Sequence, residues 1–309
     1  MIWCTLLNPS LDVICRVNEL HSGKSYTDSE CLQIPAGKGL NVARVIQALG
    51  EEVGVTGLLP EYDGKRINAV LEGNGIVHRF FSIPGGIRIN TTILEEKNGN
   101  TTHISTVSPP IPSRIQHEYF AFAAGQMKQG DYWCFTGSVP KGFSDDTYTE
   151  LINRGTLVGI KAALDSRGQV FKKGVRARPL IIKPNLSELE EFFGEQVQGV
   201  HHIAFKGKRL LDMGITYVFI SLGADGMIAL HKNDCLLCSA PNITARDTVG
   251  CGDALMAGVL VALKRQFSFT ETCRMAVACG SAKAIQSGPG IIDGTKVWQL
   301  MEEVTVTSV

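Results

Sequence analysis

The sequence predicts an α/β protein whose mostly parallel sheet is covered by helices on both faces. Short, continuously apolar runs bounded by turn residues indicate buried strands at 2–7, 53–58, 132–136, 159–164, 180–182 and 217–222. Stretches with helical spacing alternate with them at 39–49, 66–72, 114–127, 147–154 and 202–213. Repeated strand–helix–strand units with continuously apolar strands are typical of parallel sheets that are buried on both sides.

Two segments, at about 11–34 and about 86–106, lack a helical period and alternate polar and apolar residues. The second contains Lys97-Asn-Gly-Asn100, a turn sequence that favours a hairpin between 91–95 and 102–105. We expect antiparallel strands here that project from the main sheet as a small lid; simple edge strands are the alternative. The whole chain, 1–309, is expected to form one domain, with packed helices after Asp253.

Composition excludes several classes of protein. The 309 residues carry no net charge, and 44% are apolar, so a general affinity for nucleic acid is not expected. No run approaches the ~18 apolar residues of a membrane span, and the first residues lack the features of a signal peptide. These features predict a cytoplasmic protein with nine reduced cysteines. Cys235-x-x-Cys238, a lone pair, is interpreted as part of a strand.

The segment Asp247-Thr-Val-Gly-Cys-Gly-Asp253 immediately precedes an apolar helical run. Gly250, Cys251 and Gly252 should therefore lie at a helix N-terminus, where exposed backbone N–H groups and the helix dipole bind anions. Asp253 has two interpretations. It is either an acid that favours the helix dipole or a general base beside a bound phosphate.

Common nucleotide-binding motifs fail in this sequence. A dinucleotide fingerprint, GxGxxG, has leucine at its third glycine position when started at Gly250 and valine when started at Gly37. A Walker A loop ending at Lys24-Ser25 would need glycine at Asn18. Hydride transfer and P-loop chemistry are therefore disfavoured.

The segment Lys183-Pro-Asn185-Leu-Ser-Glu188 follows the strand at 180–182, and ligands of open α/β sheets bind at such strand ends. Asn185 and Glu188 should share one side of the first helical turn. An amide and a carboxylate suit a hydrated Mg²⁺ near phosphates. The alternative is a helix-capping arrangement.

Further candidates lie in the N-terminal third. Lys38 and Asn41 begin a second helix that starts at glycines, and Asp12 follows the first strand. Asp12 either holds sugar hydroxyls or forms a turn. Arg88 and Asn90 lie on the expected lid, where an arginine can clamp a phosphate or remain a solvated strand charge.

In their order along the chain, these segments resemble the signatures of the ribokinase/PfkB family of carbohydrate kinases. Asp247–Asp253 is similar to the C-terminal signature DTxGAGD, with Cys251 in place of alanine. Gly37-Lys-Gly39-Leu-Asn41 is similar to the N-terminal signature, and Ser221-Leu-Gly223-Ala-Asp-Gly226 to a nucleotide-side loop. A turn near the substrate is matched by Gly137-Ser138-Val-Pro140-x-Gly142. The similarity covers almost the whole chain.

The resemblance implies a Rossmann-type three-layer α/β/α sandwich with a small β-sheet lid through which two copies pair. It implies ATP and Mg²⁺ as cofactors, with K⁺ required by some members; the loop at 287–290 is the candidate K⁺ site here. Asp253 would be the catalytic base and Gly250, Cys251 and Gly252 the anion hole. The nucleotide and its hydrated Mg²⁺ would lie against Lys183, Asn185, Glu188, Ser221, Gly223, Gly226, Thr248, Gly250 and Gly252, with Asn185 and Glu188 nearest the metal. The sugar would lie against Asp12, Gly37, Lys38, Gly39, Asn41, Arg88, Asn90 and Ser138.

Within the family, the opening Asn8-Pro-Ser-Leu-Asp12, Lys38 and Arg88-Ile-Asn90 resemble the phosphosugar kinases. These comprise the 1-phosphofructokinase and tagatose-6-phosphate kinase branches. A phosphate already on the sugar requires cationic partners, and Lys38 and Arg88 would supply them. The expected reaction is phosphorylation of fructose 1-phosphate to fructose 1,6-bisphosphate. The alternatives are a tagatose-6-phosphate kinase, a 6-phosphofructokinase of the same family and, more remotely, a non-catalytic sugar-binding protein.

Overall fold

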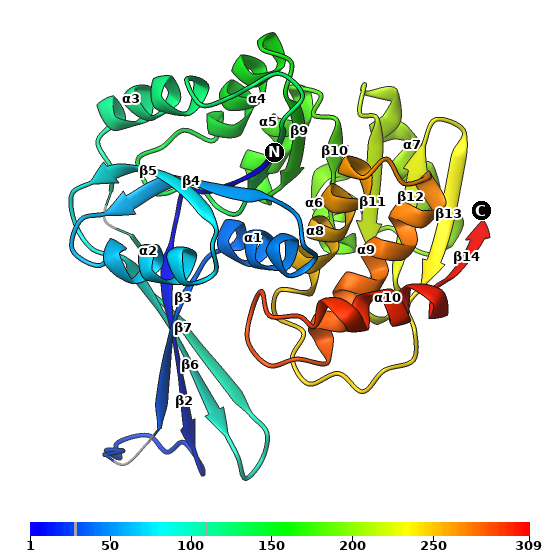
Figure 1. Cartoon of the computed structure of the whole chain (residues 1–309). Helices are drawn as coiled ribbons and strands as arrows, with labels where there is room; N and C mark the ends of the chain where they lie inside the picture. The colour runs from blue at the N-terminus through cyan, green and yellow to red at the C-terminus, as the bar shows by residue number, and fades with distance from the viewer. Residues whose placement is uncertain (28–29, 109) are drawn as a thin grey trace.

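The computed structural model describes every residue except 28, 29 and 109, so that two residues of the expected lid segment 11–34 lie outside it. The main body is built on a ten-stranded sheet with the order β14-β13-β12-β11-β10-β9-β8-β1-β4-β5 (Figure 1). Its strands are β1 (Ile2–Leu6), β4 (Val53–Pro60), β5 (Val77–Ile83), β8 (Tyr132–Thr136), β9 (Lys161–Asp165), β10 (Ile181–Ile182), β11 (Tyr217–Ser221), β12 (Met227–His231), β13 (Asp234–Ser239) and β14 (Thr305–Ser308).

The strands from β5 to β11 in that order are parallel, and β12, β13 and β14 continue the sheet antiparallel. Every strand expected from an apolar run is present. The antiparallel end was not foreseen apart from the cysteine-containing strand.

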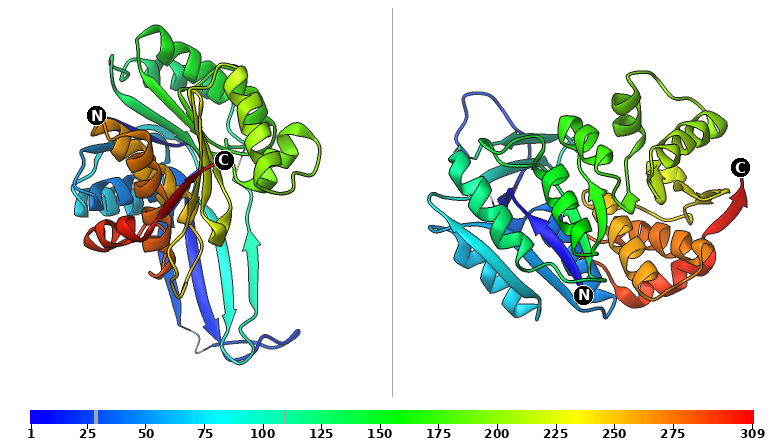
Figure 2. Two further views of the ribbon diagram at one scale, coloured as in Figure 1. Left: turned by 90° about the vertical axis from the view of Figure 1, so that its right-hand side faces the viewer. Right: turned by 90° about the horizontal axis from the view of Figure 1, so that it is seen from above.

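Helices cover both faces of the sheet, as Figure 2 shows from two sides. Successive residues of β1 enter different cores: Cys4 packs with one set of helices and Trp3 with the other. The first core contains α1 (Lys38–Ala48), α2 (Gly64–Gly73), α8 (Cys251–Lys264), α9 (Phe269–Ala284) and α10 (Gly294–Glu303). The second contains α3 (Ser113–Ala124), α4 (Thr147–Leu157), α5 (Gly168–Arg176), α6 (Leu186–Phe193) and α7 (Val200–Asp212). The three-layer α/β/α sandwich is therefore confirmed.

A second, four-stranded sheet extends from the body as an arm (Figure 1). Its order is β3-β2-β6-β7, with β2 (Ser10–Val17), β3 (Cys31–Ala36), β6 (Arg88–Glu95) and β7 (Thr101–Ser105). The two hairpins are antiparallel, but β2 and β6 pair in parallel, which corrects the expectation of antiparallel strands alone. The reason is that β2 and β6 each continue outward from a strand of the parallel sheet, β1 and β5.

The expectation that all nine cysteines are free thiols is wrong at one pair. Cys15 and Cys31 lie opposite each other on β2 and β3 and form a disulfide, because the register brings their Cα atoms to 4.2 Å. The other seven cysteines are free. Cys235 and Cys238 are buried in β13, as the strand interpretation predicted.

No helix in the described part of the chain is long and apolar enough to span a bilayer.

Helix α1 packs unusually close to β1, and Gly39 makes this approach possible. A Cβ atom built on Gly39 would lie 2.0 Å from the carbonyl oxygen of Thr5. That oxygen belongs to a strand in the centre of the sheet, so it cannot move aside without breaking strand pairing. Gly39 is thus required by packing, whatever its part in binding.

We predict that Gly39→Ala destabilises the fold by about 3 kcal/mol, at the upper end of overpacking costs, because backbone atoms must shift. Gly73→Ala is the matched control: that helical glycine has open space around its Cβ position, and alanine there should be neutral or stabilising by up to about 1 kcal/mol. Urea denaturation measures both, and equal stability of Gly39→Ala and the natural protein would refute the packing argument.

Candidate active site

The candidate site lies where parallel strands end and helix α8 begins. Gly250 is the N-cap of α8, with a left-handed φ of 86° that favours glycine, and Cys251 is the first helical residue. The first N–H groups of a helix have no partners within it and point toward this space. The expected helix N-terminus is therefore present at Gly250 and Cys251.

Asp253 lies in the first turn of α8 and is only 5% exposed. The Asn41 side-chain amide, at the start of α1, donates a hydrogen bond of 2.9 Å to its Oδ2 atom. Burial is the main cause that raises the pKa of Asp253 to about 6, and the nearby Asp165 charge acts in the same direction; Lys38 opposes them. Near neutral pH this carboxylate is ionised yet basic enough to accept a proton, which a general base requires.

Asp165, at the end of β9, is a second carboxylate in the site and is fully buried. Its Oδ1 atom lies 3.4 Å from the Nζ atom of Lys183 and 3.2 Å from that of Lys38. Burial alone would raise the pKa of Asp165, but the two lysines lower it below its ordinary value. Asp165 therefore stays charged and holds both lysines in place.

Lys38 is the first residue of α1, and its Nζ atom lies 3.2 Å from Asp165 Oδ1. Burial would lower its pKa, but the charges of Asp165, Asp253 and Glu188 raise it above the ordinary value. The ammonium group is therefore charged, and Asp165 holds it in place. Because the side chain remains 39% exposed, a ligand can still reach it.

Lys183, directly after β10, is 3% exposed and points at the N-terminus of α8. A Cβ atom on Gly252 would lie 3.3 Å from the Lys183 Nζ atom, so glycine leaves room for this ammonium group. The helix N-terminus and the lysine together bring positive charge to one place, as a bound phosphate would require.

Asn185 and Glu188 form a capping box at the start of α6. The Glu188 N–H donates to Asn185 Oδ1 at 2.8 Å, and the Asn185 N–H donates to Glu188 Oε2 at 2.9 Å. The helix-capping alternative is therefore present, and the capping bonds use only Oε2 of Glu188, which leaves Oε1 for a water molecule of a hydrated ion. The donor set fits Mg²⁺ held through water rather than directly.

The residues that were expected on the nucleotide side lie next to this segment. Ser221 pairs with Asn185 in an isolated parallel bridge, and its N–H donates to the Pro184 carbonyl oxygen. Gly223 and Gly226 form the turn that follows β11. Thr248 is exposed, and its carbonyl oxygen accepts a hydrogen bond from the Cys251 N–H.

The arm contributes a separate polar cluster. Asp12 Oδ1 accepts hydrogen bonds from Ser10 Oγ and from the Asn90 amide at 3.0 and 2.8 Å. Arg88 donates to Asn90 Oδ1 at 3.2 Å and to the Asn8 carbonyl oxygen at 3.3 Å. The Asn8 amide in turn donates to Ser138 Oγ at 3.0 Å, which ties the arm to the end of β8.

Arg167 adds a cation near this cluster. Burial lowers the pKa of Arg88; Asp12 opposes the change and the charge of Arg167 adds to it. Arg167 comes close to this cluster because the segments after β9 and β8 touch each other. Ser166 Oγ donates a hydrogen bond of 2.9 Å to the carbonyl oxygen of Gly137, which is next to Ser138.

Sequence reasoning missed Asp165 and Arg167, which follow a correctly predicted buried strand. The strand-end rule that singled out Lys183 applies equally to them.

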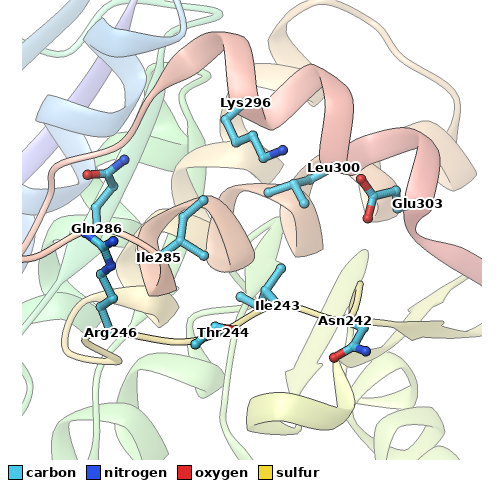
Figure 3. Close-up of a pocket in the computed structure, with 9 residues that line it drawn as sticks. All are labelled: Asn242, Ile243, Thr244, Arg246, Ile285, Gln286, Lys296, Leu300 and Glu303. Atoms are coloured by element: carbon cyan, nitrogen blue, oxygen red, sulfur yellow. The ribbon is translucent and has the colours of Figure 1, made fainter.

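A pocket of about 480 Å³ lies away from Asp253, between the segment after β13 and helix α10 (Figure 3). Arg246 and Gln286 line one part and Glu303 another. None of the residues that line it is among the site residues described above.

Comparisons with known proteins identify the family of this chain. The family model described as pfkB family carbohydrate kinase matches residues 8–294. The chain is 29% identical to a 1-phosphofructokinase of Haemophilus influenzae, with 98% of this chain and 97% of the relative covered. It is 30% identical to a tagatose-6-phosphate kinase of Staphylococcus epidermidis, with both chains covered completely. A solved structure of Escherichia coli phosphofructokinase-2 in complex with potassium superimposes with a TM-score of 0.90 at 21% identity, covering 97% and 98% of the two chains.

The match over residues 8–294 and the relatives at nearly full length show that this chain belongs to the pfkB family of carbohydrate kinases and is a phosphotransferase that acts on a sugar hydroxyl.

Proposed function

We propose that this kinase uses ATP and Mg²⁺ to phosphorylate fructose 1-phosphate to fructose 1,6-bisphosphate. The observation that carries the catalytic part is the buried Asp253, with a pKa raised to about 6, at the N-terminus of α8. The choice of fructose 1-phosphate as substrate is supported by the positive charges of Arg88 and Arg167 and by the similarity to 1-phosphofructokinases. Tagatose 6-phosphate is the second candidate, favoured by the 30% identity to a tagatose-6-phosphate kinase.

In the proposed mechanism, Asp253 accepts the proton of the sugar hydroxyl while that oxygen forms a bond to the γ-phosphorus of ATP. The bond between this phosphorus and the β–γ bridging oxygen breaks, and ADP leaves. Asn41 holds the carboxylate in orientation through its hydrogen bond. The N-terminus of α8 and Lys183 stabilise the negative charge of the transferred phosphoryl group. Mg²⁺, bound through water near Asn185 and Glu188, would neutralise charge on the ATP phosphates when present.

Lys38 and Arg88 were both expected to bind the phosphate already on the sugar. The charged groups near Lys38 differ from those near Arg88, which supports a different binding role for each. The charges of Asp165, Asp253 and Glu188 raise the pKa of Lys38, which supports a role for Lys38 at the reacting centre. The pKa of Arg88 is instead influenced by the charges of Asp12 and Arg167. We therefore assign the sugar phosphate chiefly to Arg88 and Arg167, and the transferred phosphoryl group to Lys38.

We also propose that two copies pair through the arm. The strand register places Asp12 and Asn90 on one face and Leu11, Ile89, Thr91 and Ile104 on the other. Ile89 is 41% exposed and Ile104 55% exposed. An apolar sheet face in water favours association, and a second copy supplies a matching face.

Asp253→Asn should lower kcat at least ~10²-fold, the scale of general base catalysis, and leave MgATP affinity nearly unchanged. In the natural enzyme, kcat/KM should fall about tenfold per pH unit below about 6, because protonated Asp253 cannot accept a proton. Steady-state kinetics from pH 5 to 9 measure both.

The stability of the same variant serves as its control. Because burial raises the folded-state pKa of Asp253, its charge destabilises the fold above that pKa. Asp253→Asn should therefore be at least as stable as the natural protein at pH 8. A folded variant with near-normal kcat would remove Asp253 from the role of base.

The substrate assignment predicts that turnover with ATP is highest on fructose 1-phosphate among fructose 1-phosphate, tagatose 6-phosphate, fructose 6-phosphate and free fructose. Arg88→Met should raise KM for the phosphosugar by ~10-fold or more, since a charged hydrogen bond contributes about 1.5–3 kcal/mol. KM for MgATP should stay unchanged, and the surface variant Arg154→Met should match the natural enzyme. Preference for an unphosphorylated sugar would contradict the assignment.

For the arm, we predict that the double variant Ile89→Asp/Ile104→Asp is monomeric where the natural protein is dimeric, because buried unpaired carboxylates oppose association. Leu157→Asp, at an 88% exposed position on α4, is the matched control and should stay dimeric. Sedimentation equilibrium gives the masses, and a monomeric natural protein would exclude pairing through the arm.

A further inference from the structure

Lys283 is a fully buried lysine near the end of α9, 0% exposed to solvent. Burying an ammonium group costs several kcal/mol unless oxygen atoms replace its hydration shell. The surrounding residues of α9 are mostly small or apolar, so helix packing alone does not call for a charge at this position. The oxygen atoms around the ammonium group must therefore offset the cost of burying its charge.

Three oxygen atoms surround the ammonium group. Nζ donates to the main-chain oxygen of Asp247 at 2.9 Å and to that of Gln286 at 3.4 Å. The Asp247 Oδ2 atom lies 3.3 Å away. Lys283 therefore joins the segment that begins the Asp247–Asp253 motif to the segment that follows α9.

These two segments support the anion hole. Asp247 accepts a hydrogen bond from the Val249 N–H through Oδ1 at 2.9 Å and from the Gly288 N–H through Oδ2 at 3.0 Å. The loop at 287–290 then reaches Gly250: a Cβ atom on Gly250 would lie 3.6 Å from the Gly290 nitrogen. The position of the N-cap of α8 thus depends on contacts organised around Lys283.

Two carbonyl oxygens and one carboxylate oxygen are the ligands that a monovalent cation such as K⁺ takes in proteins. K⁺ and an ammonium group carry the same charge and have similar size. The loop at 287–290 was the expected K⁺ site, yet the oxygen atoms of Asp247 and Gln286 there already bind the chain's own ammonium group. The residues present do not fit a bound K⁺.

We propose that Lys283 is a built-in replacement for a monovalent cation: a positioning residue that orders the loop before α8, so that the enzyme works without K⁺. The inference rests on the proposed kinase function for its activity readout only. Lys283 acts through Asp247 and the loop at 287–290 and touches no reacting atom.

The test compares the natural protein with Lys283→Ala, which leaves space for an ion, and Lys283→Met, which fills that space without charge. Each is studied in KCl and in tetramethylammonium chloride at equal ionic strength. The natural enzyme should have the same kcat in both salts. Lys283→Ala should lose ~10-fold or more in tetramethylammonium, consistent with displaced anion-hole donors, and KCl should restore most of the loss. Lys283→Met should lose activity in both salts.

The melting temperature gives a second readout that needs no substrate. KCl should raise it for Lys283→Ala alone, because an ion that binds only the folded state stabilises it. Lys206→Ala, which removes a buried lysine paired with Glu195 on the other face of the sheet, should melt equally in both salts. If no sugar is phosphorylated, the melting data still decide the matter.

Three results would overturn the proposal. The first is activation or thermal stabilisation of the natural protein by K⁺. The second is a folded Lys283→Ala with normal kcat in tetramethylammonium. The third is a folded, impaired Lys283→Ala that K⁺ neither activates nor stabilises. If Lys283→Ala does not fold in either salt, the natural protein's response to K⁺ decides alone.

Discussion

Two carboxylates buried at adjoining positions impose the main physical constraint on this site. Asp165 and Asp253 repel each other electrostatically, and neither charge could be buried alone without a large free-energy cost. The ammonium groups of Lys38 and Lys183 balance them, and both lie against Asp165. Asp165 is thereby neutralised by direct contact, whereas Asp253 is held mainly by the amide of Asn41. This asymmetry separates one structural carboxylate from one reactive carboxylate.

The sheet explains how residues far apart in the sequence reach this arrangement. The parallel strands β1, β8, β9 and β10 all end at the same edge. Asp165 is the last residue of β9, and Asn8, Ser138 and Lys183 follow the other three strand ends within two residues. Helices α1 and α8 then begin above the same edge and contribute Lys38 and Asp253. The close packing of α1 on β1 at Gly39 fixes the distance of Lys38 and Asn41 from the sheet. Fold stability and site geometry therefore depend on the same contact.

Much of this could be predicted from the sequence because the strands are continuously apolar and the helix starts contain glycine. The buried strand ends, the N-terminus of α8 and the hairpin turn at 97–100 follow from local rules. The parallel pairing of β2 with β6 could not be predicted, because it depends on the directions of β1 and β5. Pairing between strands that are far apart in the sequence sets those directions. The Cys15–Cys31 disulfide depends on the same register.

Charge pairs were the hardest feature to predict. Asp165 was overlooked although it directly follows the strand predicted at 159–164, because a single acid there has no local partner. The lysines that pair with it come from positions 38 and 183. Lys283 lies in an apolar helical stretch, and that mismatch is a signal that sequence reasoning could have used. Arg167 could not be linked to Arg88 without the contacts between strand ends.

The central claim is that Asp253, and not Asp165, faces the attacking hydroxyl. A crystal structure with fructose 1-phosphate, Mg²⁺ and a non-hydrolysable ATP analogue tests it most directly. We predict the acceptor hydroxyl oxygen within about 2.6–3.2 Å of an Asp253 carboxylate oxygen, the reach of a general base, with the sugar phosphate beside Arg88 and Arg167. A hydroxyl bound to Asp165, with Asp253 turned away from the sugar, would contradict the account.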